Sequence, residues 1–221
     1  MRQVDAEGRS GSRRSARQDI LRAAMELFTK EGSRGTPLAA IAERIGVTTP
    51  AITHHFGTKR ALLMEVVAQT DRLTQARLTF PPEATGLEQF TSNRQWARLL
   101  LEDDEVSHLT RLATVITAEA LDPGFPAHEH FQSRHRQFRR LLVEVLTRGQ
   151  RDGSVRADLD CHVVAAQVMA FMHGAQFHWF LDPEDVPLRQ IFDDYFERLQ
   201  RDLAPPKSPS NVRKREARAQ H

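Results

Sequence analysis

The sequence predicts an all-α protein, with an N-terminal three-helix helix-turn-helix unit and a larger helical C-terminal domain. Three observations predict this class. Apolar residues recur at spacings of three and four through most of the 221 residues, which is the period of an amphipathic helix. Almost no segment alternates as a strand does, and prolines and glycines separate the periodic segments. Finally, residues 36–60 hold two short helical segments around Gly46 and the start of a third.

The first expected helix ends near Gly32 and packs on the pair that follows. Its apolar positions keep the helical period: Ile20, Ala23, Ala24, Leu27 and Phe28. We expect Thr36 to cap the next helix, with Pro37 in its first turn. Gly46 then ends that helix because glycine readily takes a positive φ, and Val47 should pack the turn against the core.

The second helix of the pair has two distinct faces. Thr48 is its expected N-cap, and Pro50 in the first turn removes only an N–H without a helical partner. Ile52 and Phe56 face inward, so small polar groups and a methyl face outward: Thr48, Thr49, Ala51, Thr53 and His54. Such a helix can enter a DNA major groove with its N-terminal residues nearest the bases. We expect His54 to contact DNA and His55 to pack under the turn.

The charge pattern also favours a polyanionic partner. Thr58 caps the next helix, yet Lys59 and Arg60 occupy its first turn, where the helix dipole disfavours cations. A DNA phosphate near Lys59 and the Thr58 hydroxyl would supply opposing charge. Residues 1–60 hold 11 Lys/Arg and 6 Asp/Glu, residues 61–204 hold 15 and 22, and residues 205–221 hold 5 and 1. The basic arm with Arg13, Arg14 and Arg17 is either a minor-groove contact or merely solvated.

Six further helices are expected after this unit. Their approximate ranges are 59–79, 87–101, 106–121, 127–151, 160–181 and 188–203. The first joins the two domains, so a ligand that shifts it could move the DNA-reading helices. Small residues in the fifth would allow close approach to a neighbour: Ala165, Ala166, Ala170, Gly174 and Ala175. The last two helices are therefore the expected dimer surface, unless the monomer core uses both apolar stripes.

Residues 20–62 resemble the N-terminal signature of the TetR family of bacterial regulators. The matching residues are Ile20, Ala23, Ala24, Leu27, Phe28, Gly32, Thr36, Ile41, Ala42, Gly46, Val47, His54, His55, Phe56, Lys59 and Leu62. The family usually has an aromatic residue where this chain has Thr53, and Lys, Ala or a Gly-type residue where it has Pro50. The resemblance implies a homodimer that binds double-stranded operator DNA. The expected DNA-binding residues are Thr36, Thr48, Thr49, Ala51, Thr53, His54, Thr58 and Lys59.

The resemblance also implies an effector cavity in the helical body, for an unknown and largely apolar small molecule. The residues expected to line it are Trp96, Leu100, Leu112, Ile116, Phe138, Met172, His173 and Gln176. Such a mixture of apolar walls and a few polar anchors is typical of small-molecule sites, although the same residues could simply fill a core. The arginines at 134, 136, 139 and 140 form a solvated face or, alternatively, bind an anionic effector such as an acyl-CoA.

Other function classes find little support in the sequence. Cys161 is the single cysteine, which excludes an internal disulfide and indicates a small buried residue. His128-Glu129-His130 lacks metalloprotease spacing, and no phosphate loop or nucleophile motif is present, so we expect no enzyme, metal or cofactor. With no secretory signal and no membrane-spanning tract, the expected location is the cytoplasm.

We therefore expect a repressor that a small molecule releases from a palindromic operator. The alternatives are control by a protein partner and, more remotely, a helical enzyme. The expected domains are a disordered arm at 1–14, the DNA-binding unit at 15–60, the ligand-binding and dimerisation domain at 61–204, and a disordered basic tail at 205–221.

Overall fold

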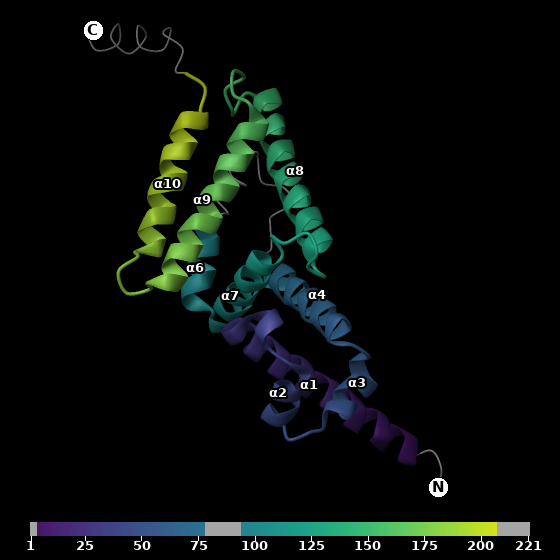
Figure 1. Ribbon diagram of the computed structural model, residues 1–221. Coiled ribbons are helices and arrows are strands. Elements are labelled where there is room, and N and C mark those ends of the chain that lie inside the picture. Colours follow the sequence, from purple (N-terminus) through teal and green to yellow (C-terminus); the bar gives the residue numbers. More distant parts are fainter. Residues whose placement is uncertain (1–3, 78–93, 207–221) are drawn as a thin grey trace, which may run out of the picture. The chain divides into compact units, whose positions relative to one another are not determined.

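Where the structure describes it, the chain is folded mainly into helices (Figure 1). The structure, a computed structural model, describes residues 4–77 and 94–206, including the side chains of residues 16–74 and 96–206. Within these ranges it contains no strand, which confirms the all-α class. The helices are α1 (Val4–Gly35), α2 (Leu38–Arg44), α3 (Thr49–Phe56), α4 (Lys59–Arg77), α6 (Arg94–Glu102), α7 (Asp104–Glu119), α8 (His128–Asp152), α9 (Cys161–Leu181) and α10 (Leu188–Leu203).

The chain divides into two compact units. The first combines Met1–Thr79 with Leu99–His135, and the second combines Phe80–Arg98 with Arg136–His221. This division does not follow the expected domain boundary at residue 60. The reason is that α4, α7 and the start of α8 share one apolar core with the helix-turn-helix segment, including Phe28, Leu62 and Ile116. Fully burying each such side chain stabilises the unit by about 1.5–3 kcal/mol.

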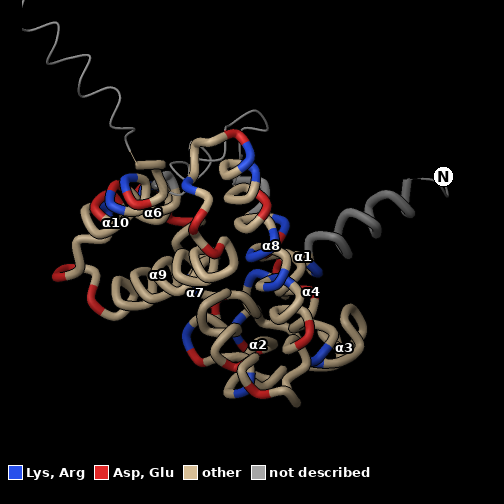
Figure 2. The backbone as a smooth tube through the Cα atoms, turned by 90° about the horizontal axis from the view of Figure 1, so that it is seen from above, with Lys and Arg blue, Asp and Glu red and all other residues tan. Residues whose placement is uncertain are grey.

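In the second unit, aromatic side chains join α9 to α10. The Phe171 ring stacks on Tyr195 with centroids 3.6 Å apart, and it also contacts Phe192 and Phe196. Burial raises the pKa of the Tyr195 hydroxyl. Leu188, Phe192, Phe196 and Leu203 of α10 are buried, so its apolar stripe is used within the chain. The charged residues spread along this helix (Figure 2) are exposed.

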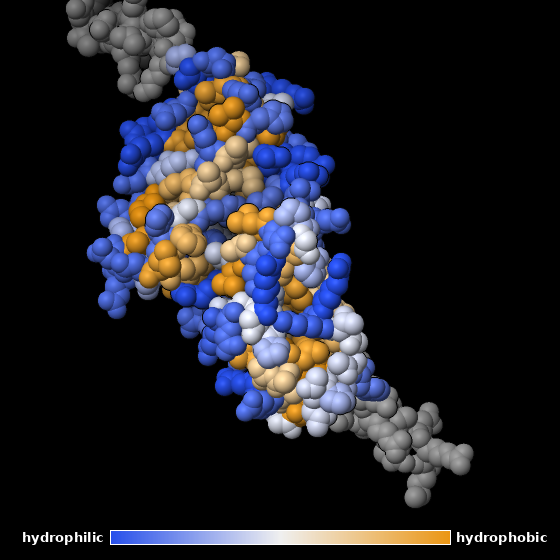
Figure 3. All heavy atoms as spheres, in the orientation of Figure 1, coloured by the Kyte–Doolittle hydropathy of each residue, from blue (hydrophilic) through white to orange (hydrophobic). Residues whose placement is uncertain are grey.

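One face of α9 stays apolar and accessible. Its residues follow a helical stripe: Val163, Ala166, Ala170, Gly174, Phe177 and Leu181. Val163 and Phe177 are each 51% exposed, and Leu181 is 70% exposed. Figure 3 shows apolar residues gathered along this helix. None of the described helices, α9 included, is both long enough and apolar enough to cross a membrane.

Several helix ends differ from those expected. Pro37, not Thr36, is the N-cap of α2. The arm expected to be disordered is helical from Val4, because extending an existing helix avoids the cost of nucleating a new one. Asp160, the first residue of the expected 160–181 helix, is the N-cap of α9 and accepts bonds from the backbone N–H groups of His162 and Val163. Residues 78–93 and 207–221 lie outside the described residues, and so do the expected start of the 87–101 helix and nearly all of the basic tail.

Candidate nucleic-acid interface

The turn between α2 and α3 orients the second helix of the pair. Gly46 has φ 69°, the left-handed conformation expected of it. The Val47 N–H donates to the Ala42 carbonyl at 2.9 Å, which closes the end of α2. The Val47 side chain is 36% exposed, so the expectation that it packs in the core is wrong. Two more backbone hydrogen bonds close the same turn, from the Ile45 N–H to the Ala42 carbonyl at 3.3 Å and from the Gly46 N–H to the Glu43 carbonyl at 3.2 Å.

Helix α3 has the two faces that its sequence predicts. Ile52 and Phe56 are buried, whereas Thr48, Thr53 and His54 are exposed. Thr48 is the N-cap by backbone conformation, but its side chain makes no capping hydrogen bond. The Thr48 hydroxyl is therefore not engaged in capping the helix. The Thr53 hydroxyl donates to the Pro50 carbonyl at 3.0 Å. Thr49 and Ala51 are half-buried at the edge of this polar surface.

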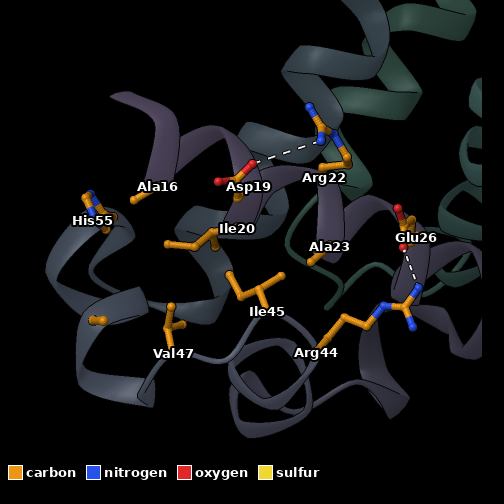
Figure 4. Close-up of a pocket in the computed structure, with 11 residues that line it drawn as sticks. Ala16, Asp19, Ile20, Arg22, Ala23, Glu26, Arg44, Ile45, Val47 and His55 are labelled. Carbon is orange, nitrogen blue, oxygen red and sulfur yellow. Dashed lines mark hydrogen bonds and ion pairs between the residues drawn. The ribbon is translucent and has the colours of Figure 1, made fainter. Parts of the chain in front are cut away.

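A shallow depression of about 450 Å³ lies behind α3, between it, α1 and α2 (Figure 4). His55 lies at its edge together with Ala51, on the side of α3 that faces α1. This placement agrees with the structural role expected of His55. Two ion pairs flank the depression, Arg22 with Asp19 at 4.0 Å and Arg44 with Glu26 at 3.1 Å. It contains none of the residues expected to bind the effector.

The start of α4 places a cation beside α3. Thr58 caps this helix, because its Oγ1 accepts from the Ala61 N–H at 3.1 Å. Lys59 opens the helix, and its first turn holds no acidic residue. Lys59 Nζ donates to the carbonyl oxygen of Arg34 at 3.2 Å, near the C-terminal end of α1. Arg34 follows the non-helical Gly32, so this single carbonyl oxygen, and not a continuous helix dipole, gives the Lys59 ammonium a partner that the first turn of α4 does not supply.

Thr36 must be removed from the candidate DNA-binding residues. Its side chain is 0% exposed, and its Oγ1 donates to the Gly32 carbonyl at 2.8 Å. A fully buried hydroxyl whose proton is already donated cannot reach a phosphate. Thr36 instead stabilises the turn between α1 and α2.

Arg17 is the part of the basic arm whose side chain can be described. Its Nη2 lies 3.3 Å from Glu65 Oε2. Its guanidinium carbon lies 4.8 Å from the centroid of the Phe56 ring. These contacts hold Arg17 against α3 and α4. The side chains of Arg13 and Arg14 lie outside the described residues, so a minor-groove contact from the arm stays a prediction.

The residues expected to line the effector cavity fall in both compact units. Leu100, Leu112 and Ile116 are buried in the first. The second holds the other five: Trp96, Phe138, Met172, His173 and Gln176. Trp96 and Gln176, 80 positions apart in sequence, are brought together, since the indole Nε1 donates to Gln176 Oε1 at 3.4 Å. Gln176 is only 8% exposed, so its side of this polar contact is largely shielded from solvent.

Sequence reasoning did not find one polar cluster within the first unit. Asp71 on α4 is 2.6 Å from Arg134 Nη1 and 2.7 Å from His130 Nε2, both on the first turns of α8. The sequence predicts Arg134 either on a solvated face or at an anionic effector, but its partner is this carboxylate. The sequence around Arg134, which contains several other arginines, does not indicate a contact with a residue more than 60 positions away.

Two family models and several known proteins match this chain. The model of bacterial regulatory proteins of the tetR family matches residues 20–66. The model of the BetI-type transcriptional repressor C-terminal region matches residues 94–201. Among curated relatives, the HTH-type transcriptional repressor KstR2 of Rhodococcus jostii is 25% identical and covers 91% of this chain and 96% of its own. KstR2 of Mycolicibacterium smegmatis is 26% identical over 68% of this chain and 72% of its own.

Solved structures agree on the fold. A TetR transcriptional regulator from Chloroflexus aurantiacus superposes with a TM-score of 0.74 at 17% identity, covering 87% of this chain and 98% of its own. The chain belongs to the TetR family of bacterial regulatory proteins. It is a ligand-responsive, DNA-binding transcriptional repressor, with its DNA-binding segment at the N-terminus.

Proposed function

We propose that this repressor binds a palindromic operator as a homodimer, with α3 of each subunit in a major groove. The observation that carries the proposal is the exposed polar edge formed by Thr48, Thr53 and His54, which adjoins the cationic start of α4. A helix that presents short hydroxyl and imidazole groups can approach base edges closely. Two such helices related by a two-fold axis require half-sites about one helical turn apart.

Different residues of this interface have different tasks in the proposal. Thr49 and His54, together with the Ala51 methyl, read base edges from the first turns of α3. Thr48, Thr53, Thr58 and Lys59 bind phosphate oxygens, which sets orientation without reading sequence. Pro50 offers no backbone N–H, so the phosphate contacts in its neighbourhood come from side-chain hydroxyls.

The effector in this proposal is a small and largely apolar molecule. Its polar anchor is the Trp96–Gln176 pair of the second unit, where indole N–H and carboxamide can each exchange their mutual bond for one to the ligand. Phe138, Met172 and His173 of the same unit supply the adjoining side chains. Binding favours a placement of α4 in which the two α3 helices no longer match successive grooves, so the operator is released.

The operator assignment is tested by selecting bound sequences from a random duplex library and then comparing wild-type protein with Thr49→Ala. The selected site should be palindromic and bind two chains. Thr49→Ala should weaken binding to this site by about 1–3 kcal/mol per half-site, with a smaller effect on random DNA. Fluorescence anisotropy with both duplexes measures the difference. Equal losses of affinity on the two duplexes would show that Thr49 does not read bases.

A further inference from the structure

The end of α7 binds, through a single carboxylate, the last residues of α1, which follow the non-helical Gly32 and turn the chain toward α2. Glu119 is the last residue of α7 and is half-buried. Its Oε2 accepts a hydrogen bond from Ser33 Oγ at 2.5 Å, and its Oε1 accepts one from the backbone N–H of Arg34 at 2.9 Å. Ser33 is only 2% exposed. Both oxygens of this carboxylate thus bind adjacent residues of the same segment.

The chain makes room for this contact at Gly32. Gly32 has φ 74° and ψ 160°, a backbone conformation that residues with a Cβ atom rarely adopt. A Cβ atom added there would lie 2.8 Å from Glu119 Oε1. Two further contacts secure the same segment: Arg34 forms an ion pair with Asp122, and its guanidinium carbon lies 5.4 Å from the Phe125 ring centroid. Asp122 and Phe125, which follow α7, therefore add contacts to the same segment that Glu119 binds.

Two charges at unfavourable helix ends meet at Arg34. Glu119 lies at the C-terminal end of α7, where the dipole disfavours an anion, and Lys59 lies at the N-terminal end of α4, where it disfavours a cation. Arg34 partners both, because its N–H donates to Glu119 and its carbonyl accepts from Lys59 Nζ at 3.2 Å. The position of the Lys59 ammonium is thus linked to that of the Glu119 carboxylate through one residue.

We infer that Glu119 is a positioning residue for operator binding, acting through Arg34 on Lys59. Glu119 fixes the position of Arg34, whose carbonyl oxygen accepts the hydrogen bond from Lys59 Nζ. This contact keeps the Lys59 ammonium at the DNA-facing end of α4. All the residues involved lie in the first compact unit. This inference rests on the proposed phosphate contact of Lys59, and it joins the end of α7 to that contact. Movement of α7 would then reach the DNA interface by a route that does not require α4 to bend.

The test is a double-mutant cycle on the full-length protein with the selected operator. Glu119→Ala should lower operator affinity about tenfold, as expected for loss of hydrogen bonds to a charged group, and lower the salt slope by up to about one per subunit. In a Lys59→Ala background the same substitution should cost less than about threefold, because its target is gone. Glu119→Gln should stay within about threefold of wild type, since its amide can still accept from Arg34 and donate to Ser33.

Controls separate positioning from folding. Glu144 is exposed on α8, and Glu144→Ala should leave both affinity and salt slope unchanged. If circular dichroism shows that Glu119→Ala does not fold, Glu119→Asp takes its place, since it keeps the charge but lacks one methylene of reach. Equal losses of affinity from the Glu119 change in both Lys59 backgrounds would overturn the inference. If Lys59→Ala alone has no effect, the phosphate contact itself is wrong and the inference falls with it, while operator binding by wild-type protein still stands.

Discussion

Lys59 carries its charge where α4 offers no stabilisation for it, and a phosphate is the natural counterion. We predict that Lys59→Ala weakens binding to operator and random duplexes by similar factors. The slope of log affinity against log salt should fall by about one unit for each phosphate that a subunit no longer neutralises. Lys30→Ala, an exposed lysine on α1, is the control. If the slope stays constant while affinity falls for one sequence only, Lys59 reads bases instead.

Asp122 provides a prediction for the dependence of stability on pH. The hydrogen bond from Arg34, followed by that from the Gly124 N–H, lowers the pKa of this carboxyl. A lowered folded-state pKa means that the stabilisation is present above the unfolded pKa, near 4, and is lost as pH falls through the folded value. Asp122→Asn should therefore lose less unfolding free energy than wild type between about pH 5 and pH 2.

Urea unfolding at several pH values measures this difference. Because Asp122 is exposed, we expect a small effect, within the range of surface ion pairs. Asp193→Asn, at an exposed position on α10, should follow the wild-type curve. A wild-type acid dependence in Asp122→Asn would mean that the ion pair with Arg34 contributes nothing to the folded state.

At the level of single helices, α9 and α10 differ in what they leave accessible. The apolar side of α10 packs on α9, and its outer side is charged, so α10 alone offers little apolar surface to a partner. The stripe from Val163 to Leu181 on α9 is apolar and exposed. Small residues within it, Ala166 and Ala170, allow another helix to approach closely. The expected dimer surface therefore rests chiefly on this face of α9.

We predict that Ala170→Glu prevents dimer formation, because it would bury a charge in the centre of an apolar helix contact. Sedimentation velocity should show a shift from dimer to monomer, and operator binding should weaken at least about tenfold, since each monomer then binds a single half-site. Ala157→Glu, at an exposed position between α8 and α9, is the matched control. Dimeric Ala170→Glu protein with normal operator affinity would place the dimer surface elsewhere.

Across the molecule, the proposed communication between effector and operator uses helices α4, α7 and α8. Helix α4 begins beside the DNA-reading helix, and Asp71 further along it binds His130 and Arg134 of α8. Helix α8 starts in the first compact unit and continues into the second. In the proposed mechanism a ligand influences the first unit in two ways, through α4 itself and through the end of α7.

Coupling between the two ligands should be reciprocal. Compounds that raise the thermal unfolding temperature identify an effector, and Trp179→Phe leaves Trp96 as the single tryptophan that reports its binding. We predict that saturating effector weakens operator binding by about 5–150-fold, and that saturating operator weakens effector binding by the same factor. An effector that binds tightly but leaves operator affinity unchanged would refute the mechanism.

Features that depend on local periodicity and backbone chemistry could be predicted from the residues alone. The α2–α3 pair followed from the apolar spacing around Gly46, whose positive φ is a property of that residue. The inward direction of Ile52 and Phe56 followed from helical geometry. Capping by Thr58 and by Asp160 was likewise predictable, because a cap involves residues only two or three positions apart.

Accessibility and the meeting of distant residues, in contrast, depend on how the helices pack. Thr36 and Thr48 have similar sequence surroundings, yet one is fully buried and the other exposed, because packing around the α1–α2 turn encloses only the first. The Glu119 contact with Ser33 spans 86 positions and the Trp96 contact with Gln176 spans 80. No local pattern encodes such pairs, since they form only when separate helices pack and bring their polar groups to the same place.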